Sequence, residues 1–365
     1  MENNFNRMGR TITSIVVISL FALLPIVTGS GTIAPLWAGG EKICAYDGFA
    51  EIDASKNHFI VVGDTQKTGL WEFWRERNDR ERRIIVNEME RRGPAFVLHL
   101  GDLTTRGGSR KQWQEFDELH TAFGERAMPY FPVLGNHEFY GNRGKALGYY
   151  FTRFPHLEHR GWYSFTWKKV GLIMFDSKFS TLSLEEIREQ AQWCLGELGK
   201  FEKDEKVDFV IVCCHEPPFT NSRVVSPNEK VKILFADPFV QFEKTSLFFS
   251  GHSHSYERFQ SGNKLFVVSG GGGGPRHKVH VDPKKQRRED LFLGPELRFF
   301  HICELQVGEE GLAYSVLRLG DDRDFSVVDR LMLGKSRGRT GENENPMRPV
   351  STGTIGRETK DHHQQ

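Results

Sequence analysis

Short apolar runs alternate with charged, helix-like stretches through the first half of the chain. Apolar strands are predicted over residues 58–64, 95–102 and 131–138, with helices over 71–92 and 111–123 between them. Gly93 and Gly124 follow the two helices, as is common at helix C-termini. This alternation predicts strands in a sheet that is covered by helices.

The second half mixes paired strands with helices. A hairpin is predicted from residues 162–167 and 171–176, and a helix over 183–200 that begins with a Ser183-x-x-Glu186 capping box. A buried strand over 208–215, a helix over 231–242 and strands over 246–250, 264–269, 298–306 and 312–319 follow. One mixed α/β domain over residues 52–333 is therefore expected.

The two ends of the chain have other compositions. Arg7 and Arg10 precede an uncharged apolar run over residues 11–27, and small residues follow it. This order predicts a secretory signal within residues 1–38 and hence export to the periplasm or medium; retention as a membrane anchor is the alternative. Residues 334–365 contain few apolar side chains, which predicts a disordered C-terminal tail.

Charge and cysteine content narrow the possible partners. The 49 Lys and Arg residues almost balance the 48 Asp and Glu residues, so no nucleic-acid-binding surface is indicated, nor a membrane partner apart from the N-terminal segment. Five cysteines are too few for a disulfide framework, and Cys213 and Cys214 lie in an apolar run where buried thiols are expected.

Polar side chains that can bind metals follow the apolar strands. Gly precedes most of these side chains, which are Asp64, Asp102, Asn136, His215 and the pair His252 and His254. One such residue is usually part of a turn, and a His-x-His pair alone also occurs on surfaces. Because strand ends on one side of a sheet cluster in space, the repeated pattern instead predicts one shared pocket.

The ligand types indicate the chemistry of that pocket. Two carboxylates, one amide and three imidazoles are too many for one ion and suit two, which a shared carboxylate holds about 3.5–4 Å apart. Mixed oxygen and nitrogen donors favour two divalent or trivalent transition-metal ions such as Mn, Fe or Zn, and no thiolate ligand is indicated.

The five motifs resemble those of the calcineurin-like metallophosphoesterases. The motifs are Gly63-Asp64-x-Gln66, Gly101-Asp102, Gly135-Asn136-His137-Glu138, His215 and Gly251-His252-x-His254. The Tyr256-Glu257-Arg258 sequence is similar to the purple acid phosphatase branch. The resemblance implies a four-layer αββα sandwich of two mixed β-sheets flanked by helices, with a dinuclear metal centre.

The resemblance also implies roles for single residues. Asp64, Asp102, His254 and Gln66 would bind the first ion, and Asp102 would bridge to the second, which Asn136, His215 and His252 complete. His137 would protonate the leaving oxygen or donate to the phosphoryl group, with Glu138 orienting it. Two positions depart from the pattern: Gln66 stands where a His is common, and Thr105 stands where the purple acid phosphatases carry a metal-binding Tyr.

These observations lead to a functional hypothesis. The chain is expected to hydrolyse small-molecule phosphate esters, monoesters in preference, through a hydroxide that bridges the two ions. Asn136 and His137, and the backbone amides of Gly271 and Gly272 in a glycine run, are candidate substrate contacts. A phosphodiesterase with the same centre, and a scaffold that binds metal or a phosphorylated ligand without turnover, are the alternatives.

Overall fold

The computed structural model describes residues 36–38, 41–43, 45–46, 48–49, 52–69, 72–126, 128–335 and 347–349. The chain divides into two units, Met1–Ala34 and Pro35–Gln365, and all described residues belong to the second. Most of the expected export signal, residues 1–35, thus lies outside the described residues. Among the described helices, none is long and apolar enough to span a bilayer.

One sheet has seven strands, and the first three predicted strands lie next to one another at one end of it. Its order is β15 (Met347–Pro349), β14 (Phe325–Gly334), β13 (Gly311–Leu319), β12 (His301–Val307), β3 (His58–Val62), β4 (Val97–His99) and β5 (Tyr130–Pro132). β3, β4 and β5 pair in parallel, and the other neighbours pair antiparallel. The three parallel strands therefore end at the same edge of this sheet.

The other sheet has six strands. Its order is β10 (Tyr256–Ser261), β11 (Lys264–Ser269), β9 (Thr245–Ser250), β8 (Phe209–Cys214), β7 (Val170–Met174) and β6 (Tyr163–Trp167). The four inner strands are parallel, and β6 and β10 pair antiparallel at the two edges. Both sheets are therefore mixed, as the resemblance implies.

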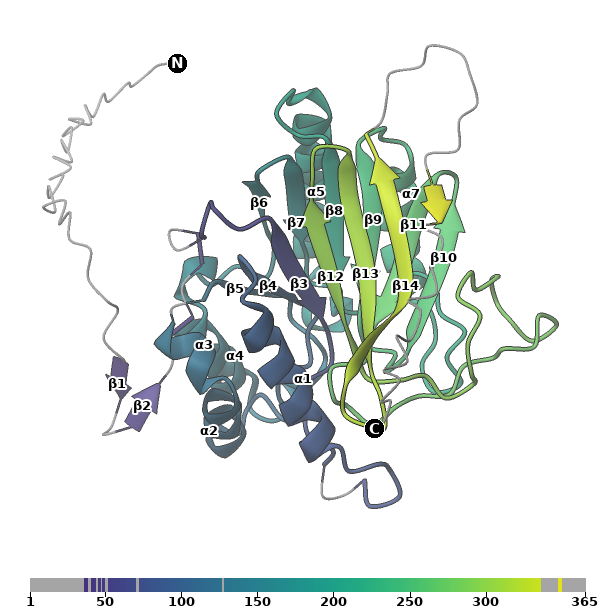
Figure 1. The fold of residues 1–365 in the computed structure, drawn as a ribbon. Helices are drawn as coiled ribbons and strands as arrows, with labels where there is room; N and C mark the ends of the chain where they lie inside the picture. The colour runs from purple at the N-terminus through teal and green to yellow at the C-terminus, as the bar shows by residue number, and fades with distance from the viewer. Residues whose placement is uncertain are drawn as a thin grey trace, which may run out of the picture. The chain divides into compact units, whose positions relative to one another are not determined.

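Helices cover the outer face of each sheet (Figure 1). Between strands of the first sheet lie α1 (Asp79–Arg92), α2 (Arg110–Leu119) and α3 (Thr121–Glu125). The 3₁₀ turn η1 (His137–Phe139), α4 (Arg143–Arg153) and the 3₁₀ turn η2 (Pro155–Leu157) follow β5. The second sheet has the 3₁₀ turn η3 (Phe179–Thr181), α5 (Leu184–Lys203), α6 (Glu229–Val231), the π-helical turn η4 (Lys232–Ala236) and α7 (Asp237–Val240). A separate hairpin joins β1 (Leu36–Ala38) and β2 (Glu41–Ile43).

Alternation along the strands produces the four layers. Side chains of successive strand residues point to opposite faces, so each sheet buries two sets of apolar groups. Phe59 and Val61 of β3 pack with Ile211 and Cys213 of β8 in a core between the sheets. Ile60 and Val62 pack instead against Ile85 and Met89 of α1, and Val210 and Val212 against Leu198 of α5. The predicted αββα sandwich is confirmed.

Two local predictions differ from the structure. The helix expected over residues 71–92 begins only at Asp79, and Trp74 lies in a loop with 69% of its surface exposed. The aromatic residue that suggested a longer helix therefore adds nothing to the buried face. Within the expected disordered tail, Met347–Pro349 form β15, which pairs with Leu331–Leu333. The open edge of β14 offers backbone groups for such pairing.

The capping box of α5 is confirmed. Ser183 Oγ accepts from the Glu186 backbone N–H, and the Glu186 carboxylate accepts from the Ser183 N–H. The two bonds satisfy amides that the first helical turn leaves unpaired.

Candidate metal centre

The strand ends of both sheets bring the predicted ligands together. Asp64, Asp102 and Asn136 follow β3, β4 and β5, while His215 follows β8 and His252 and His254 follow β9. Neighbouring segments tie these ends to one another: Asp64 N–H donates to Gly101 O at 3.1 Å, and Gly251 N–H donates to His215 O at 2.9 Å. The meeting point is thus the carboxyl edge shared by the two sets of parallel strands.

Two groups of three ligands share the Asp102 carboxylate. One group is Asp64, Asp102 and His254, and the other is Asp102, His215 and His252. In each group the ligand atoms lie within 4.8 Å of one another. A carboxylate that belongs to both groups is the donor arrangement that a two-ion site requires, so these residues fit a dinuclear centre.

Backbone carbonyls orient the imidazole rings of His215 and His254. His215 Nδ1 lies 2.8 Å from Leu100 O, and His254 Nδ1 lies 2.8 Å from Pro275 O. These bonds leave Nε2 of both rings facing the centre, where they lie 3.4 Å from Asp102 Oδ2 and Asp64 Oδ1 respectively. A carbonyl partner of this kind fixes the tautomer that a metal-binding imidazole needs.

Asn136 faces the second group. Its Oδ1 lies 3.0 Å from His215 Nε2, and its Nδ2 donates to the Tyr140 hydroxyl at 2.9 Å. His252 Nδ1 lies 3.1 Å from the same His215 nitrogen. One amide oxygen and two imidazole nitrogens thus converge on one point beside Asp102.

Gln66 faces the first group. Its amide is best oriented with Oε1 3.1 Å from His254 Nε2, while Nε2 donates to the backbone carbonyls of Asp64 and Asp102 at 3.1 Å. This orientation directs the amide oxygen to the side on which an ion would lie. Gln66 thus faces His254 with an amide oxygen, which is a weaker donor than imidazole.

Acidic and basic side chains of the centre shift one another's pKa values. Burial disfavours protonation of His215, but the Asp102 carboxylate outweighs it and raises the pKa of His215 to about 10. Burial also opposes ionisation of Asp102, yet His215 and His137 hold the pKa of that carboxyl well below its usual range. A cation that binds beside His215 would therefore compete with a proton for this imidazole.

Three of the predicted ligands have left-handed backbone conformations. The φ angles are 61° for Asp64, 57° for Asp102 and 65° for His252. Non-glycine residues adopt this region rarely, and strain of this kind concentrates at functional sites. The turn after each strand directs the side chain toward the centre. Its left-handed residue has a higher backbone energy than one in the common regions.

His137 lies at the edge of the centre. Its Nδ1 lies 2.7 Å from Thr105 O, and its Nε2 lies 3.8 Å from Asp102 Oδ2. Thr105 therefore contributes its carbonyl to the ring that was expected to act as an acid. The side chain of His137 is 19% exposed, which leaves Nε2 accessible to a bound ester.

Glu138 does not contact the His137 ring as the resemblance implied. Its two carboxylate oxygens accept backbone N–H groups of Asp102, Leu103, Thr104 and Gly135. Burial, and next the charge of Asp102, raise the pKa of Glu138 to about 7. Glu138 thus holds the turn that carries Asp102 and is too enclosed to reach a substrate.

The glycine run has a different role from the one expected. Gly272 N–H donates to Gly63 O at 2.9 Å, so this amide is occupied, and a Cβ on Gly271 would lie 2.1 Å from the His301 ring. The glycines are buried because the backbone passes against neighbouring segments there. The Gly272 amide is therefore not available for the predicted phosphate contact, and close packing accounts for both glycines.

The contacts of three neighbours of the centre were not predicted from the sequence. The His277 ring stacks on His254 with centroids 4.3 Å apart, and its Nδ1 accepts the His254 N–H at 3.2 Å. Arg276 is paired with Glu76, and Tyr140 contacts Asn136. Tyr140 alone had a visible signal, because it lies four positions after Asn136 in a segment that leaves the strand end.

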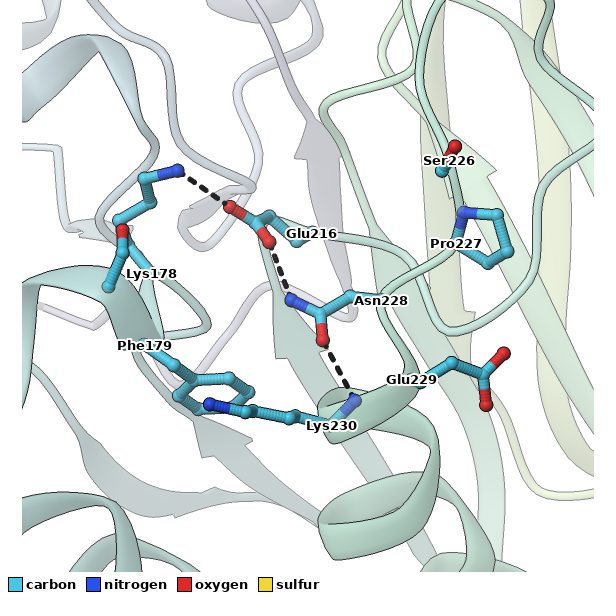
Figure 2. Close-up of a pocket in the computed structure, with 9 residues that line it drawn as sticks. Lys178, Phe179, Glu216, Ser226, Pro227, Asn228, Glu229 and Lys230 are labelled. Atoms are coloured by element: carbon cyan, nitrogen blue, oxygen red, sulfur yellow. Dashed lines mark hydrogen bonds and ion pairs between the residues drawn. The ribbon is translucent and has the colours of Figure 1, made fainter. Parts of the chain in front are cut away.

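A pocket of about 480 Å³ lies beside the second group of ligands. Its wall includes Glu216, which directly follows His215, and Lys178, Phe179, Asn228 and Lys230. Figure 2 shows the Glu216 carboxylate between Lys178 Nζ at 3.2 Å and Asn228 Nδ2 at 2.5 Å. Ser177 Oγ accepts the N–H groups of His215 and Glu216, which fixes the pocket wall relative to the ligand.

Comparisons with known proteins agree with this geometry. Residues 58–256 match the family described as calcineurin-like phosphoesterase. Tartrate-resistant acid phosphatase type 5 of Sus scrofa is 25% identical over 77% of this chain and 85% of its own length. A purple acid phosphatase from yellow lupin (Lupinus luteus) seeds shares the fold with a TM-score of 0.58 and 18% identity, over 76% of this chain and 53% of that one.

A protein that is named as an anchor and not as a phosphatase has the same fold. The anchor in the inner membrane complex of Plasmodium aligns with a TM-score of 0.57 and 16% identity, over 78% of this chain and 90% of that one. At such identities the two structural likenesses show the fold alone.

Proposed function

Because the chain belongs to the calcineurin-like phosphoesterase family and is a phosphoester hydrolase, we propose that it hydrolyses small phosphate monoesters at two bound metal ions. The observation that carries the proposal is the pair of ligand groups joined by Asp102. Two isolated groups would suit two independent ions, whereas a shared carboxylate couples them in one reaction centre.

The residues divide between two ions. Asp64, Asp102, His254 and Gln66 would hold the first, and Asp102, Asn136, His215 and His252 the second. Their oxygen and nitrogen donors suit Mn, Fe or Zn. When bound, the two ions supply an activated water as nucleophile and positive charge for the phosphoryl oxygens.

The protein positions the ester and moves a proton. His137 is held through Nδ1 by Thr105 O, so Nε2 is the atom that faces the centre. In the protonated form, Nε2–H would donate to the oxygen that leaves phosphorus. As the bond from water oxygen to phosphorus forms and the ester P–O bond breaks, that proton passes to the leaving alcohol.

The alcohol part of the ester has a place beside the centre. The pocket lined by Lys178, Glu216 and Asn228 adjoins His215 and offers polar groups of both signs. We assign this pocket to the leaving group, which favours polar alcohols over extended apolar ones.

The test uses chelated protein reconstituted with Mn, Fe or Zn, with aryl phosphate mono- and diesters as substrates. We expect turnover of monoesters in the reconstituted protein, little in the chelated protein, and a loss of at least about 100-fold in Asp102→Asn, which weakens both ion sites. Equal, negligible rates in all samples would overturn the hydrolase assignment. Preferential turnover of diesters would overturn the monoester assignment.

We also propose that the protein acts after export. The basic, apolar and small-residue order of residues 1–38 supports this. Cell fractionation followed by N-terminal sequencing tests it: a mature form that begins after the apolar run is expected outside the cytoplasm, and a full-length cytoplasmic form would contradict it.

A further inference from the structure

We propose that the Tyr140 hydroxyl donates a hydrogen bond to the phosphoryl group of the bound ester. The inference rests on the proposed function and adds a substrate contact that the motifs do not assign. It is carried by the position of one phenol between Asn136 and His137.

Backbone bonds fix Tyr140 at the edge of the metal centre. Tyr140 ends the turn η1, and its N–H donates to His137 O at 3.1 Å. Its carbonyl accepts the Gly108 N–H at 2.9 Å. The ring lies beside that of His137, with centroids 4.6 Å apart and planes inclined by 48°. The phenol is therefore held next to the imidazole that faces the leaving oxygen.

The direction of the phenolic proton follows from the Asn136 amide. Asn136 Oδ1 faces the second ligand group, 3.0 Å from His215 Nε2, as a metal ligand must. Its Nδ2 then points to Tyr140 and donates to the hydroxyl oxygen at 2.9 Å. Because Nδ2 is only a donor, the phenol's own proton has to point elsewhere.

That proton has no acceptor among the residues that the structure describes, where the Asn136 amide is the hydroxyl's hydrogen-bond partner. The side chain of Tyr140 is 47% exposed, so the hydroxyl lies at an open mouth and not in a closed core. A phosphoryl group held between the two ligand groups would bring a charged oxygen to this mouth. Hydrogen bonds to a charged acceptor are about twice as strong as neutral ones.

The test compares Tyr140→Phe with the wild type. The phenylalanine keeps the ring beside His137 and removes only the hydroxyl. We expect metal-loaded Tyr140→Phe to bind inorganic phosphate roughly tenfold more weakly by calorimetry, as loss of one hydrogen bond to a charged group predicts. The kcat/KM for aryl phosphates should fall by a similar factor, with the metal stoichiometry unchanged.

Tyr163→Phe is the matched control. Its phenol donates to Pro132 O at 2.9 Å, so this variant also loses one phenolic hydrogen bond, away from the ligands. Phosphate affinity should stay at the wild-type value.

Two outcomes would overturn the inference. Unchanged phosphate affinity in Tyr140→Phe would show that the hydroxyl does not touch the phosphoryl group. Loss of one metal equivalent would show that Tyr140 serves only to orient Asn136. Because phosphate binding needs no turnover, the experiment remains decisive for Tyr140 even if the wild type hydrolyses none of the esters.

Discussion

Glu76 and Arg276 form a bidentate ion pair, with Arg276 Nη2 2.6 Å from Glu76 Oε1 and Arg276 Nε 3.0 Å from Glu76 Oε2. Arg276 lies between Pro275, whose carbonyl accepts from His254 Nδ1, and His277, whose ring stacks on His254. The pair therefore fixes residues 275–277, which orient the proposed metal ligand His254, to the loop before α1. Burial opposes ionisation of Glu76, but Arg276 lowers the pKa of this carboxyl overall.

Breaking this ion pair should weaken the first metal site. In Glu76→Gln the charge that holds Arg276 is lost, so residues 275–277 should orient His254 less well. We expect roughly 10-fold weaker binding of one of the two metal equivalents, the size typical of lost second-layer contacts. Calorimetric titration of chelated protein with Mn or Zn measures it.

Asp117→Asn is the control for that variant. Asp117 forms a more deeply buried ion pair with Arg153, with 2.6 Å between Oδ2 and Nη2. Its loss should lower the free energy of unfolding and leave both metal affinities intact. Equal metal loss in the two variants would mean that Glu76 acts only through global stability.

Gln66 should determine the affinity of the first ion. Gln66→Ala removes the amide oxygen that faces His254 Nε2 and both amide bonds to the backbone carbonyls of Asp64 and Asp102. We expect one metal equivalent to bind at least about tenfold more weakly, with the other unchanged.

Gln66→His supplies the stronger nitrogen donor at the same position. Tighter binding of the same equivalent is expected, because imidazole suits Mn, Fe and Zn sites. Metal affinities of both variants equal to the wild type would remove Gln66 from the ligand set.

The glycine run should be sensitive to a single methyl group. A Cβ on Gly272 would lie 2.4 Å from Gly63 O, and backbone there has little room to move. We expect Gly272→Ala to lower the free energy of unfolding by about 1–3 kcal/mol, as overpacking does.

Gly199→Ala is the paired variant. Gly199 lies in α5, and a Cβ there would have no neighbour within 4 Å. Alanine should stabilise the helix by roughly 0.5–1 kcal/mol. Urea unfolding measures both changes, and a harmless Gly272→Ala would contradict the packing role.

Asp176 should make stability depend on pH. Burial raises the pKa of this carboxyl to about 7 from 3.8. The folded state therefore binds more protons than the unfolded state between these values, and this contribution to stability is present below about pH 4 and lost as the pH rises through about 7. At most about 4 kcal/mol is involved.

Asp176→Asn removes the titration while keeping an oxygen that can accept the Lys178 N–H, which Asp176 Oδ1 accepts at 2.7 Å. The variant should become more stable than the wild type as the pH rises from about 4 to about 8. Urea unfolding of chelated protein at several pH values measures the difference. A difference that does not vary with pH would show that Asp176 is ionised in the folded protein.

The order of strands and helices was predictable because each buried strand and each amphipathic helix repeats its own period. The same pattern placed Asp64, Asp102, Asn136 and His215 at strand ends, and the structure brings these residues together. The sequence shows that each of these residues directly follows a strand. Parallel pairing of the strands then places their carboxyl ends at the same edge of a sheet.

The supporting contacts were not predictable in the same way. Glu76 meets Arg276 across 200 residues, and His277 stacks on His254 from a loop with no periodic pattern. The glycine run was misread because flexibility and close packing both favour glycine in a sequence. Only the neighbouring backbone, here Gly63 O, decides between them.

The left-handed backbone of Asp64, Asp102 and His252 has a consequence for engineering. Glycine adopts this conformation without strain, so replacing a ligand at one of these positions with glycine would relieve backbone energy while abolishing metal binding. Selection for thermal stability alone would therefore favour loss of the proposed metal ligands. A stability screen of this protein therefore has to include an activity measurement, because the residues proposed to bind metal also have strained backbone conformations.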